Sequence, residues 1–309
     1  MSALRERAEE YLKLRRALGY DLADAARLLP RFVDHLEQIG AESITREAAL
    51  AWVLRPDADA TSSVWARRMA AVRGFARHMS GIDTRTEVPP LGLVTFRTRW
   101  RPPFIYSSED VQALMSEATR TIPTPFRAAT YTTLIGLLGA TGLRVGEAIR
   151  LSRNDVDFTE AVVVVRASKF KKSREVPVAS STAEALADYA HKRNHWQPVP
   201  KVSAFFTSTA GTAVHYEDFG KTFRKLIAMT GVGATSSSRP RIHDLRHSFA
   251  VQTLIGWYRS GQDVGALLPR LSTYMGHRDP TSTYWYLSAV PDLLALAAAR
   301  LQTSQQGRP

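Results

Sequence analysis

The segment TEVPPLGLVTFRTRWRPP (residues 86–103) constrains the architecture of this chain more than any other stretch. Two Pro-Pro pairs bracket Arg97, Arg99 and Arg101. Proline discourages helix, and basic side chains suit an extended linker that follows a polyanion. At 309 residues, the chain also exceeds the usual length of a single domain. We therefore expect two domains, residues 1–98 and 99–309, with their boundary inside this linker.

The first domain is predicted to be a helical bundle. Apolar side chains recur at helical spacing, most clearly in residues 22–40. Glycines, which favour the ends of helices, follow three such stretches at positions 19, 40 and 81. We expect four helices, near residues 2–17, 22–39, 46–54 and 62–80.

The last of these helices carries an apolar stripe flanked by arginines. The stripe consists of Val64, Met69, Val72 and Phe75, and the arginines are Arg67, Arg68, Arg73 and Arg77. Such a helix can pack inward through its stripe while its arginines contact DNA. The alternative is the solvated face of an ordinary surface helix, and the helix alone does not decide between the two.

The overall charge favours a polyanionic partner. Lys and Arg number 41 against 29 acidic residues, which gives a net charge of +12. Residues 1–98 hold 15 basic and 13 acidic side chains, so +10 of this charge belongs to the second domain. The excess predicts nucleic acid first and a membrane surface second. A generically basic protein is the alternative.

The absence of cysteine excludes disulfides, thiolate catalysis and zinc sites built on cysteine. No apolar stretch approaches the roughly 18 residues of a membrane span, and the N-terminal MSALRERAEE does not resemble a signal peptide. We expect a cytoplasmic, nucleoid-associated protein.

The second domain is predicted to be mainly α-helical with a small β-sheet. Ser107 and Asp110 form a capping pattern that opens a helix. The segments Ala161–Arg166 (AVVVVR) and Glu175–Val178 (EVPV) are typical of two short strands. The polar turn between them carries basic side chains, which are expected to contact phosphates: Lys169, Lys171, Lys172 and Arg174.

Three segments hold residues suited to phosphodiester chemistry: TGLRVGEAIRL (Thr141–Leu151), HDLRHSFA (His243–Ala250) and YMGHRDPTSTYWYL (Tyr274–Leu287). Arginine offers a fork of donors that matches phosphate oxygens. Histidine donates hydrogen bonds or transfers protons near neutral pH. Tyrosine can attack phosphorus and hold a covalent intermediate. Convergence of these groups would suit phosphoryl transfer.

Spacing within two of these segments predicts local pairs. Glu147 follows Arg144 at i+3, close enough to hold its guanidinium, although a lone pair of this kind is more often a surface ion pair. His243 and Arg246 are also i and i+3, so that one helical face presents both.

Two assignments stay open on chemistry alone. A lysine of the polar turn can protonate a leaving oxygen, but all three can equally contact backbone phosphates. Three tyrosines lie near His277, namely Tyr274, Tyr284 and Tyr286, and at least two of them must be packing residues.

Together these motifs resemble the tyrosine recombinase (lambda-integrase-like) family over roughly Tyr106 to Leu301. The resemblance implies that Arg144, Lys169, His243, Arg246, His277 and Tyr286 are catalytic and that Glu147 supports Arg144. Tyr286 is selected because the nucleophile of the family lies nine residues after the histidine of the Gly-His pair. The sequence departs from the family at Ser168 and Phe170, because family members usually have glycines at these two positions, on either side of the catalytic lysine. The long segment LIGWYRSGQDVGALLPRLSTYMGH (residues 254–277) resembles a transposon-borne subgroup.

The resemblance also implies a mechanism and an assembly. Tyr286 attacks the scissile phosphate and forms a 3′-phosphotyrosyl link, while Lys169 protonates the departing 5′-oxygen, with no cofactor and no metal. A helical core-binding (SAM-like) domain and an α+β catalytic domain form a C-shaped clamp on double-stranded DNA. The helix predicted for Val290–Leu301 docks on a neighbouring protomer in a homotetramer on paired sites, with sister recombinases as a further option. Intramolecular packing is the alternative for that helix.

The expected function is that of a site-specific recombinase of a mobile element or a chromosome-maintenance system, and there are two alternatives. A type IB topoisomerase-like enzyme shares the phosphotyrosyl chemistry. A catalytically silent DNA-binding protein would not require all six positions to hold competent residues, as they do here.

Overall fold

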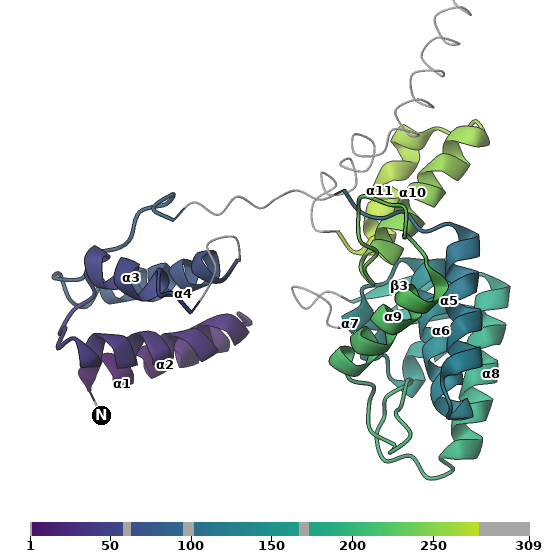
Figure 1. Cartoon of the computed structure of the whole chain (residues 1–309), viewed down its shortest axis with the longest axis horizontal. Helices are drawn as coiled ribbons and strands as arrows, with labels where there is room; N and C mark the ends of the chain where they lie inside the picture. The colour runs from purple at the N-terminus through teal and green to yellow at the C-terminus, as the bar shows by residue number, and fades with distance from the viewer. Residues whose placement is uncertain (1, 58–62, 95–101, 167–172, 278–309) are drawn as a thin grey trace, which may run out of the picture. The chain divides into compact units, whose positions relative to one another are not determined.

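The computed structural model describes residues 2–57, 63–94, 102–166 and 173–277. The chain divides into two compact units, Met1–Trp100 and Arg101–Pro309 (Figure 1). The domain boundary expected at residues 98 and 99 falls outside the described residues. Each unit has a hydrophobic core of its own.

The first unit contains the four helices expected from the apolar periodicity. They are α1 (Ala3–Ala17), α2 (Ala23–Gln38), α3 (Arg46–Val53) and α4 (Val64–Met79), so each predicted helix is confirmed to within two residues at either end. Met69, Val72 and Phe75 of α4 are buried in one core with Phe32 and Leu36 of α2. The apolar stripe of α4 therefore faces inward, as its spacing predicts.

The second unit is mainly helical, which confirms the predicted fold class. Its described residues form the helices α5 (Ser108–Thr121), α6 (Pro125–Thr141), α7 (Val145–Ile149), α8 (Ser180–Trp196), α9 (Tyr216–Thr230), α10 (Asp244–Arg259) and α11 (Val264–Met275), with a 3₁₀ turn at Arg153–Asp155. Helix α5 opens with the predicted capping box: Ser107 Oγ accepts from the Asp110 amide at 3.1 Å, and the Asp110 carboxylate accepts from the Ser107 amide at 2.9 Å.

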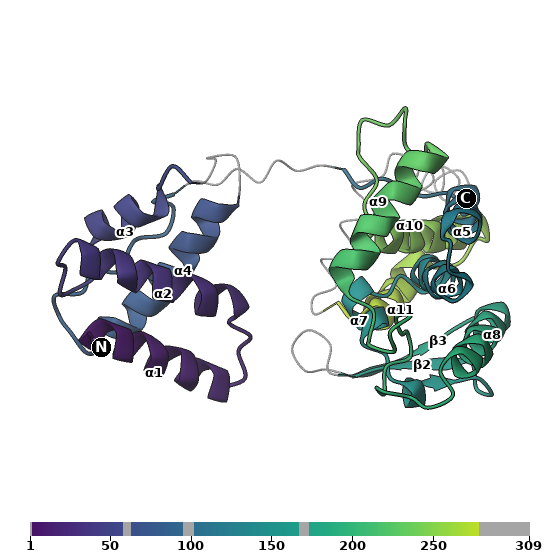
Figure 2. The same cartoon turned by 60° about the horizontal axis from the view of Figure 1, so that its bottom comes forward.

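A small antiparallel sheet accompanies these helices. Its strands are β1 (Val156–Asp157), β2 (Val162–Val165) and β3 (Arg174–Pro177), in that order. Val163 pairs with Val176, and both are fully buried in the core that also holds Leu186 of α8. Figure 2 shows β2 and β3 side by side. Strand β1 was not predicted, because two residues are too short to show an alternation.

Strand β3 begins one residue earlier than predicted. Arg174 pairs with Val165 and so belongs to the strand, whereas the sequence suggested that it lies in the polar turn. This shift moves its side chain from an expected loop to the end of a sheet. It is the first of two corrections to the predicted basic residues.

Helices α10 and α11 pack against each other through a separate apolar cluster that includes Leu254 and Leu271. They position the loop between Met275 and His277, which follows α11. Within the described residues, no helix is both long and apolar enough to cross a bilayer.

Candidate active site

Arg144 stands at the start of α7, directly after the end of α6. Its backbone amide and its Nη1 both donate to the Glu147 carboxylate, at 3.1 and 2.7 Å. The Glu147 side chain is 2% exposed, whereas that of Arg144 is 28% exposed. The predicted i, i+3 pair therefore exists, and it holds a guanidinium that solvent can still reach.

Arg246 lies in the first turn of α10 and is fixed by two backbone carbonyls. Nη1 donates to Gly142 O at 2.7 Å, and Nη2 donates to Met275 O at 2.6 Å. Arg246 is only 3% exposed. Its guanidinium thus joins the end of α6 to the end of α11.

The two arginines meet at one short turn. Arg144 Nη2 donates to Gly276 O at 3.2 Å, next to the Met275 carbonyl that accepts from Arg246. His277 follows directly. Residues more than a hundred positions apart therefore converge, and the structure brings four of the predicted site residues together: Arg144, His243, Arg246 and His277.

The histidines of this cluster are held in their neutral form. Burial, with the nearby Arg246 and Arg144, lowers the pKa of His277 to about 4. Burial, with Arg246 next, also lowers the pKa of His243. Neutral imidazoles at neutral pH can accept a proton or donate one hydrogen bond.

His247 is a third histidine in the cluster that sequence reasoning missed. Its ring lies edge-on to that of His243, with centroids 4.9 Å apart. Burial and His243 lower its pKa to about 4. The signal was its i+4 spacing from His243, which places both on one helical face.

Arg174 is the first basic residue whose prediction needs correction. It was expected to contact DNA from the polar turn, but its side chain is 10% exposed. Nη2 binds Glu147 at 2.9 Å, and Nε donates to Tyr274 O at 2.8 Å. The guanidinium is therefore part of the cluster, because the strand register directs it inward.

Arg68 is the second correction. It is 8% exposed, and its two terminal nitrogens bind both oxygens of Asp57, at 2.9 and 2.6 Å. It lies beside the buried Met69 on the inner side of α4, so it does not present an exposed cation. Arg67 and Arg77 are exposed, as expected. The Arg73 guanidinium donates hydrogen bonds to the carbonyls of Pro89 and Pro90.

Tyr274 is one of the packing tyrosines. Its hydroxyl donates to Pro177 O at 3.1 Å, its ring stacks on Phe249, and burial raises its pKa to about 12. Several predicted residues lie outside the described residues: Arg97, Arg99, Arg101, Lys169, Lys171, Lys172, Tyr284, Tyr286 and the segment 290–301.

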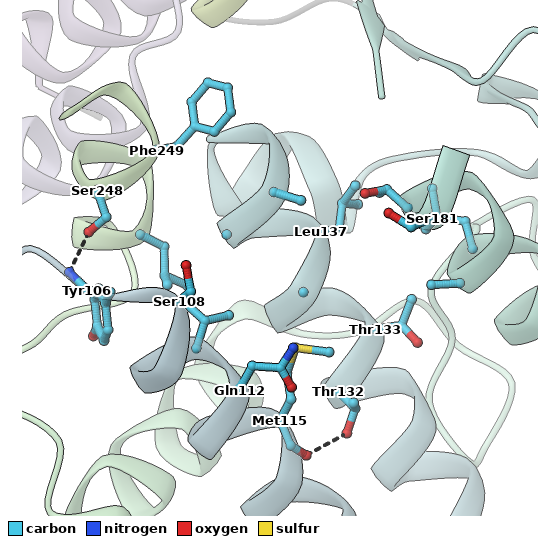
Figure 3. Close-up of a pocket in the computed structure, with 18 of the residues that line it drawn as sticks. Tyr106, Ser108, Gln112, Met115, Thr132, Thr133, Leu137, Ser181, Ser248 and Phe249 are labelled. Atoms are coloured by element: carbon cyan, nitrogen blue, oxygen red, sulfur yellow. Dashed lines mark hydrogen bonds between the residues drawn. The ribbon is translucent and has the colours of Figure 1, made fainter. Parts of the chain in front are cut away.

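The cluster is distinct from a cavity of about 590 Å³ between α5, α6, α8 and α10. Figure 3 shows that Met115, Thr132 and Ser181 line this cavity. Of the predicted catalytic residues that the structure describes, namely Arg144, His243, Arg246 and His277, none lines it. Among the described residues, no group of three or more acidic or histidine side chains is placed to hold a metal ion.

Comparison with known proteins identifies the family to which this chain belongs. The model of the phage integrase family matches residues 105–291. A putative integrase/recombinase of Sinorhizobium fredii, y4rB, is 43% identical over all of both chains, and the tyrosine recombinase XerC of Rhodospirillum centenum is 30% identical over 85% of this chain and 74% of its own. The Tn1549 transposon integrase, solved in complex with transposon right end DNA, has the same fold, with a TM-score of 0.66 at 18% identity over 96% of this chain and 98% of that one.

The protein is therefore a tyrosine-type site-specific recombinase. The chain belongs to the phage integrase family. The comparisons lend no support to the topoisomerase alternative.

Proposed function

We propose that Arg144, Lys169, His243, Arg246, His277 and Tyr286 form a single active site that cuts and rejoins DNA. One observation carries the proposal: guanidinium groups from two separate segments are both anchored on the turn before His277, at Met275 O and Gly276 O. Such convergence has little use in a packed core, because each buried cation needs compensation. It suits a doubly charged transition state of phosphoryl transfer.

In the proposed reaction, the Tyr286 hydroxyl oxygen forms a bond to the scissile phosphorus, and the bond from phosphorus to the 5′-oxygen breaks. Lys169 gives a proton to that oxygen, which leaves as a 5′-hydroxyl. The 5′-hydroxyl of a partner strand then attacks the 3′-phosphotyrosyl link and releases Tyr286. The phosphodiester energy stays in the covalent link, so the exchange is balanced without ATP.

The cluster would stabilise the charge that develops on the non-bridging oxygens. Arg144 is suited to direct contact because its guanidinium is partly exposed. The neutral His277 and His243 would add a hydrogen bond or accept the tyrosine proton. Glu147 would orient Arg144.

Binding and assembly are part of the proposal. We expect the exposed Arg67 and Arg77 of α4 to contact double-stranded DNA. The linker arginines Arg97, Arg99 and Arg101 and the lysines Lys171 and Lys172 are proposed to do the same. Two further features are predictions. One is a homotetramer on paired sites, with the segment 290–301 docked on a neighbouring protomer, and the other is a clamp of both units around the duplex. A role in transposition of a mobile element is supported by the likeness to a transposon integrase. The location would be cytoplasmic, on the nucleoid.

The deciding experiment traps the covalent intermediate. Purified protein is incubated with a nicked suicide substrate made from the DNA that flanks its gene, and the covalent adduct is measured. Tyr286→Phe is expected to abolish the adduct, while the matched Tyr284→Phe retains it. Adduct that persists in Tyr286→Phe would exclude Tyr286 as the nucleophile.

A further inference from the structure

We propose that Arg174 is a positioning residue, which keeps the Arg144 guanidinium and the turn before His277 in the arrangement that the scissile phosphate requires. The inference rests on the proposed function of this cluster and deepens it. Arg174 itself is not expected to touch DNA, since its side chain is 10% exposed.

The first support is a carboxylate shared by two arginines. Glu147 Oε1 accepts from Arg144 Nη1 at 2.7 Å and from Arg174 Nη1 at 3.3 Å. Its other oxygen accepts from the Arg144 amide at 3.1 Å and from Arg174 Nη2 at 2.9 Å. Both arginines therefore set the plane of one carboxylate, and the rotation of Glu147 relative to Arg144 is restricted.

The second support is the contact between Arg174 and the turn itself. Arg174 Nε donates to Tyr274 O at 2.8 Å, one residue before the carbonyl that accepts from Arg246. Gly276 has φ +68°, and a Cβ there would lie 2.7 Å from Arg174 Nη1. The guanidinium thus packs directly on the backbone that leads to His277, and only glycine fits between them.

The third support is the charge balance. Glu147 is 2% exposed and carries one negative charge, which would cancel that of Arg144 if the two formed an isolated pair. With Arg174 included, the three side chains sum to one positive charge. That surplus remains available to a phosphate, since a second cation compensates the buried carboxylate.

Loss of Arg174 should therefore affect the reaction more than the fold. Glu147 would bind Arg144 alone and draw its guanidinium toward the carboxylate. A displacement of about 1 Å at a positioning group can lower a rate about 100-fold. Lysine at position 174 would restore the charge without the fork that joins Glu147 to Tyr274 O.

The test compares two substrates and three variants of the full chain. Arg174→Gln and Arg174→Lys are assayed for adduct formation on the ordinary suicide substrate and on one whose scissile phosphate is a methylphosphonate, which lacks one non-bridging charge. Arg166→Gln is the matched control. It removes the arginine that directly follows β2, whose guanidinium binds the buried Asp155 at 2.6 Å instead of Glu147.

We expect Arg174→Gln to form adduct about 100-fold more slowly than wild type on the phosphodiester. On the methylphosphonate the defect should shrink to less than about tenfold, because less charge then needs to be stabilised. Arg174→Lys should fall between wild type and Arg174→Gln on the phosphodiester, and Arg166→Gln should match wild type on both substrates.

Two results would overturn the inference. An equal defect of Arg174→Gln on both substrates would mean that the residue only maintains the fold, and wild-type rates on the phosphodiester would mean that it has no role. If Arg174→Gln does not fold, as judged by thermal denaturation, the same two criteria are applied to Arg174→Lys. Absence of adduct with the wild-type protein would instead contradict the proposed function, so the two failures are distinguishable.

Discussion

Arg246 Nη1 donates to the carbonyl of Gly142 at 2.7 Å, across 104 residues of sequence. Gly142 ends α6 in the left-handed conformation, with φ +61°, and directly precedes the segment that begins with Leu143 and Arg144. The same contact therefore fixes Arg246 on α10 and the turn after α6 that presents Arg144. Mutations at and around this contact test its role.

Gly142→Ala should destabilise the protein by about 1–3 kcal/mol, because a non-glycine residue is strained at this φ. A Cβ at this position would also lie 2.6 Å from the Phe249 ring. Gly231→Ala is the matched control, since Gly231 has φ +69° and nothing within 4 Å of its Cβ position. Urea denaturation should show a larger loss for Gly142→Ala, and equal losses would exclude a role for the Phe249 contact.

Arg246→Lys should lower the rate of adduct formation about 100-fold while DNA binding is retained. Lysine keeps the charge but cannot donate to Gly142 O and Met275 O from a planar fork. Adduct formation and gel-shift affinity would be measured on the same DNA. A rate within a factor of about three of wild type would show that the fork is not required.

Tyr274→Phe should leave adduct formation intact and cost about 0.5–1.5 kcal/mol of stability. The change removes the hydrogen bond from the Tyr274 hydroxyl to Pro177 O but keeps the ring on Phe249. Denaturation and the suicide-substrate assay measure the two effects separately. Loss of the adduct in Tyr274→Phe would indicate that the wrong tyrosine has been assigned.

Stability should fall as the pH is lowered from 6.5 toward 4. The pKa values of His247 and His277 are lowered from 6.5 to about 4 in the folded protein, mainly by burial. Over this window the unfolded chain binds more protons than the folded one, so protonation favours unfolding. Urea denaturation at several pH values tests this, and His247→Gln should flatten the dependence. An unchanged slope in that variant would mean that His247 titrates normally.

The two arginines Arg68 and Arg77 of α4 should behave oppositely. Arg77→Gln should weaken DNA binding and reduce the salt dependence of the DNA affinity by the equivalent of about one phosphate contact. The stability of the protein should not change, because the Arg77 side chain is exposed. Arg68→Gln should lower the denaturation midpoint, since it removes both bonds to Asp57 and leaves a buried position unpaired. Weaker DNA binding by folded Arg68→Gln, at equal stability, would contradict its structural assignment.

The sequence alone determined what local spacing encodes. The four helices of the first unit follow from apolar periodicity, and Arg144 with Glu147 follows from an i, i+3 relation that a single helical turn satisfies. The motifs also indicate the tyrosine recombinase family without reference to the tertiary structure. All of these depend on neighbours within a few residues, whose geometry is set by the backbone of one element.

The tertiary structure alone decided which distant groups share a site. Arg174 pairs with Glu147 across 27 residues, and Arg246 reaches Met275 across 29, because packing of β3, α7, α10 and α11 brings these segments together. Arg68 likewise turned inward to Asp57. A charged residue in a sequence pattern carries no mark of its partner, and the free energy of burying it depends on that partner, so only the packed chain separates a structural arginine from a DNA-binding one.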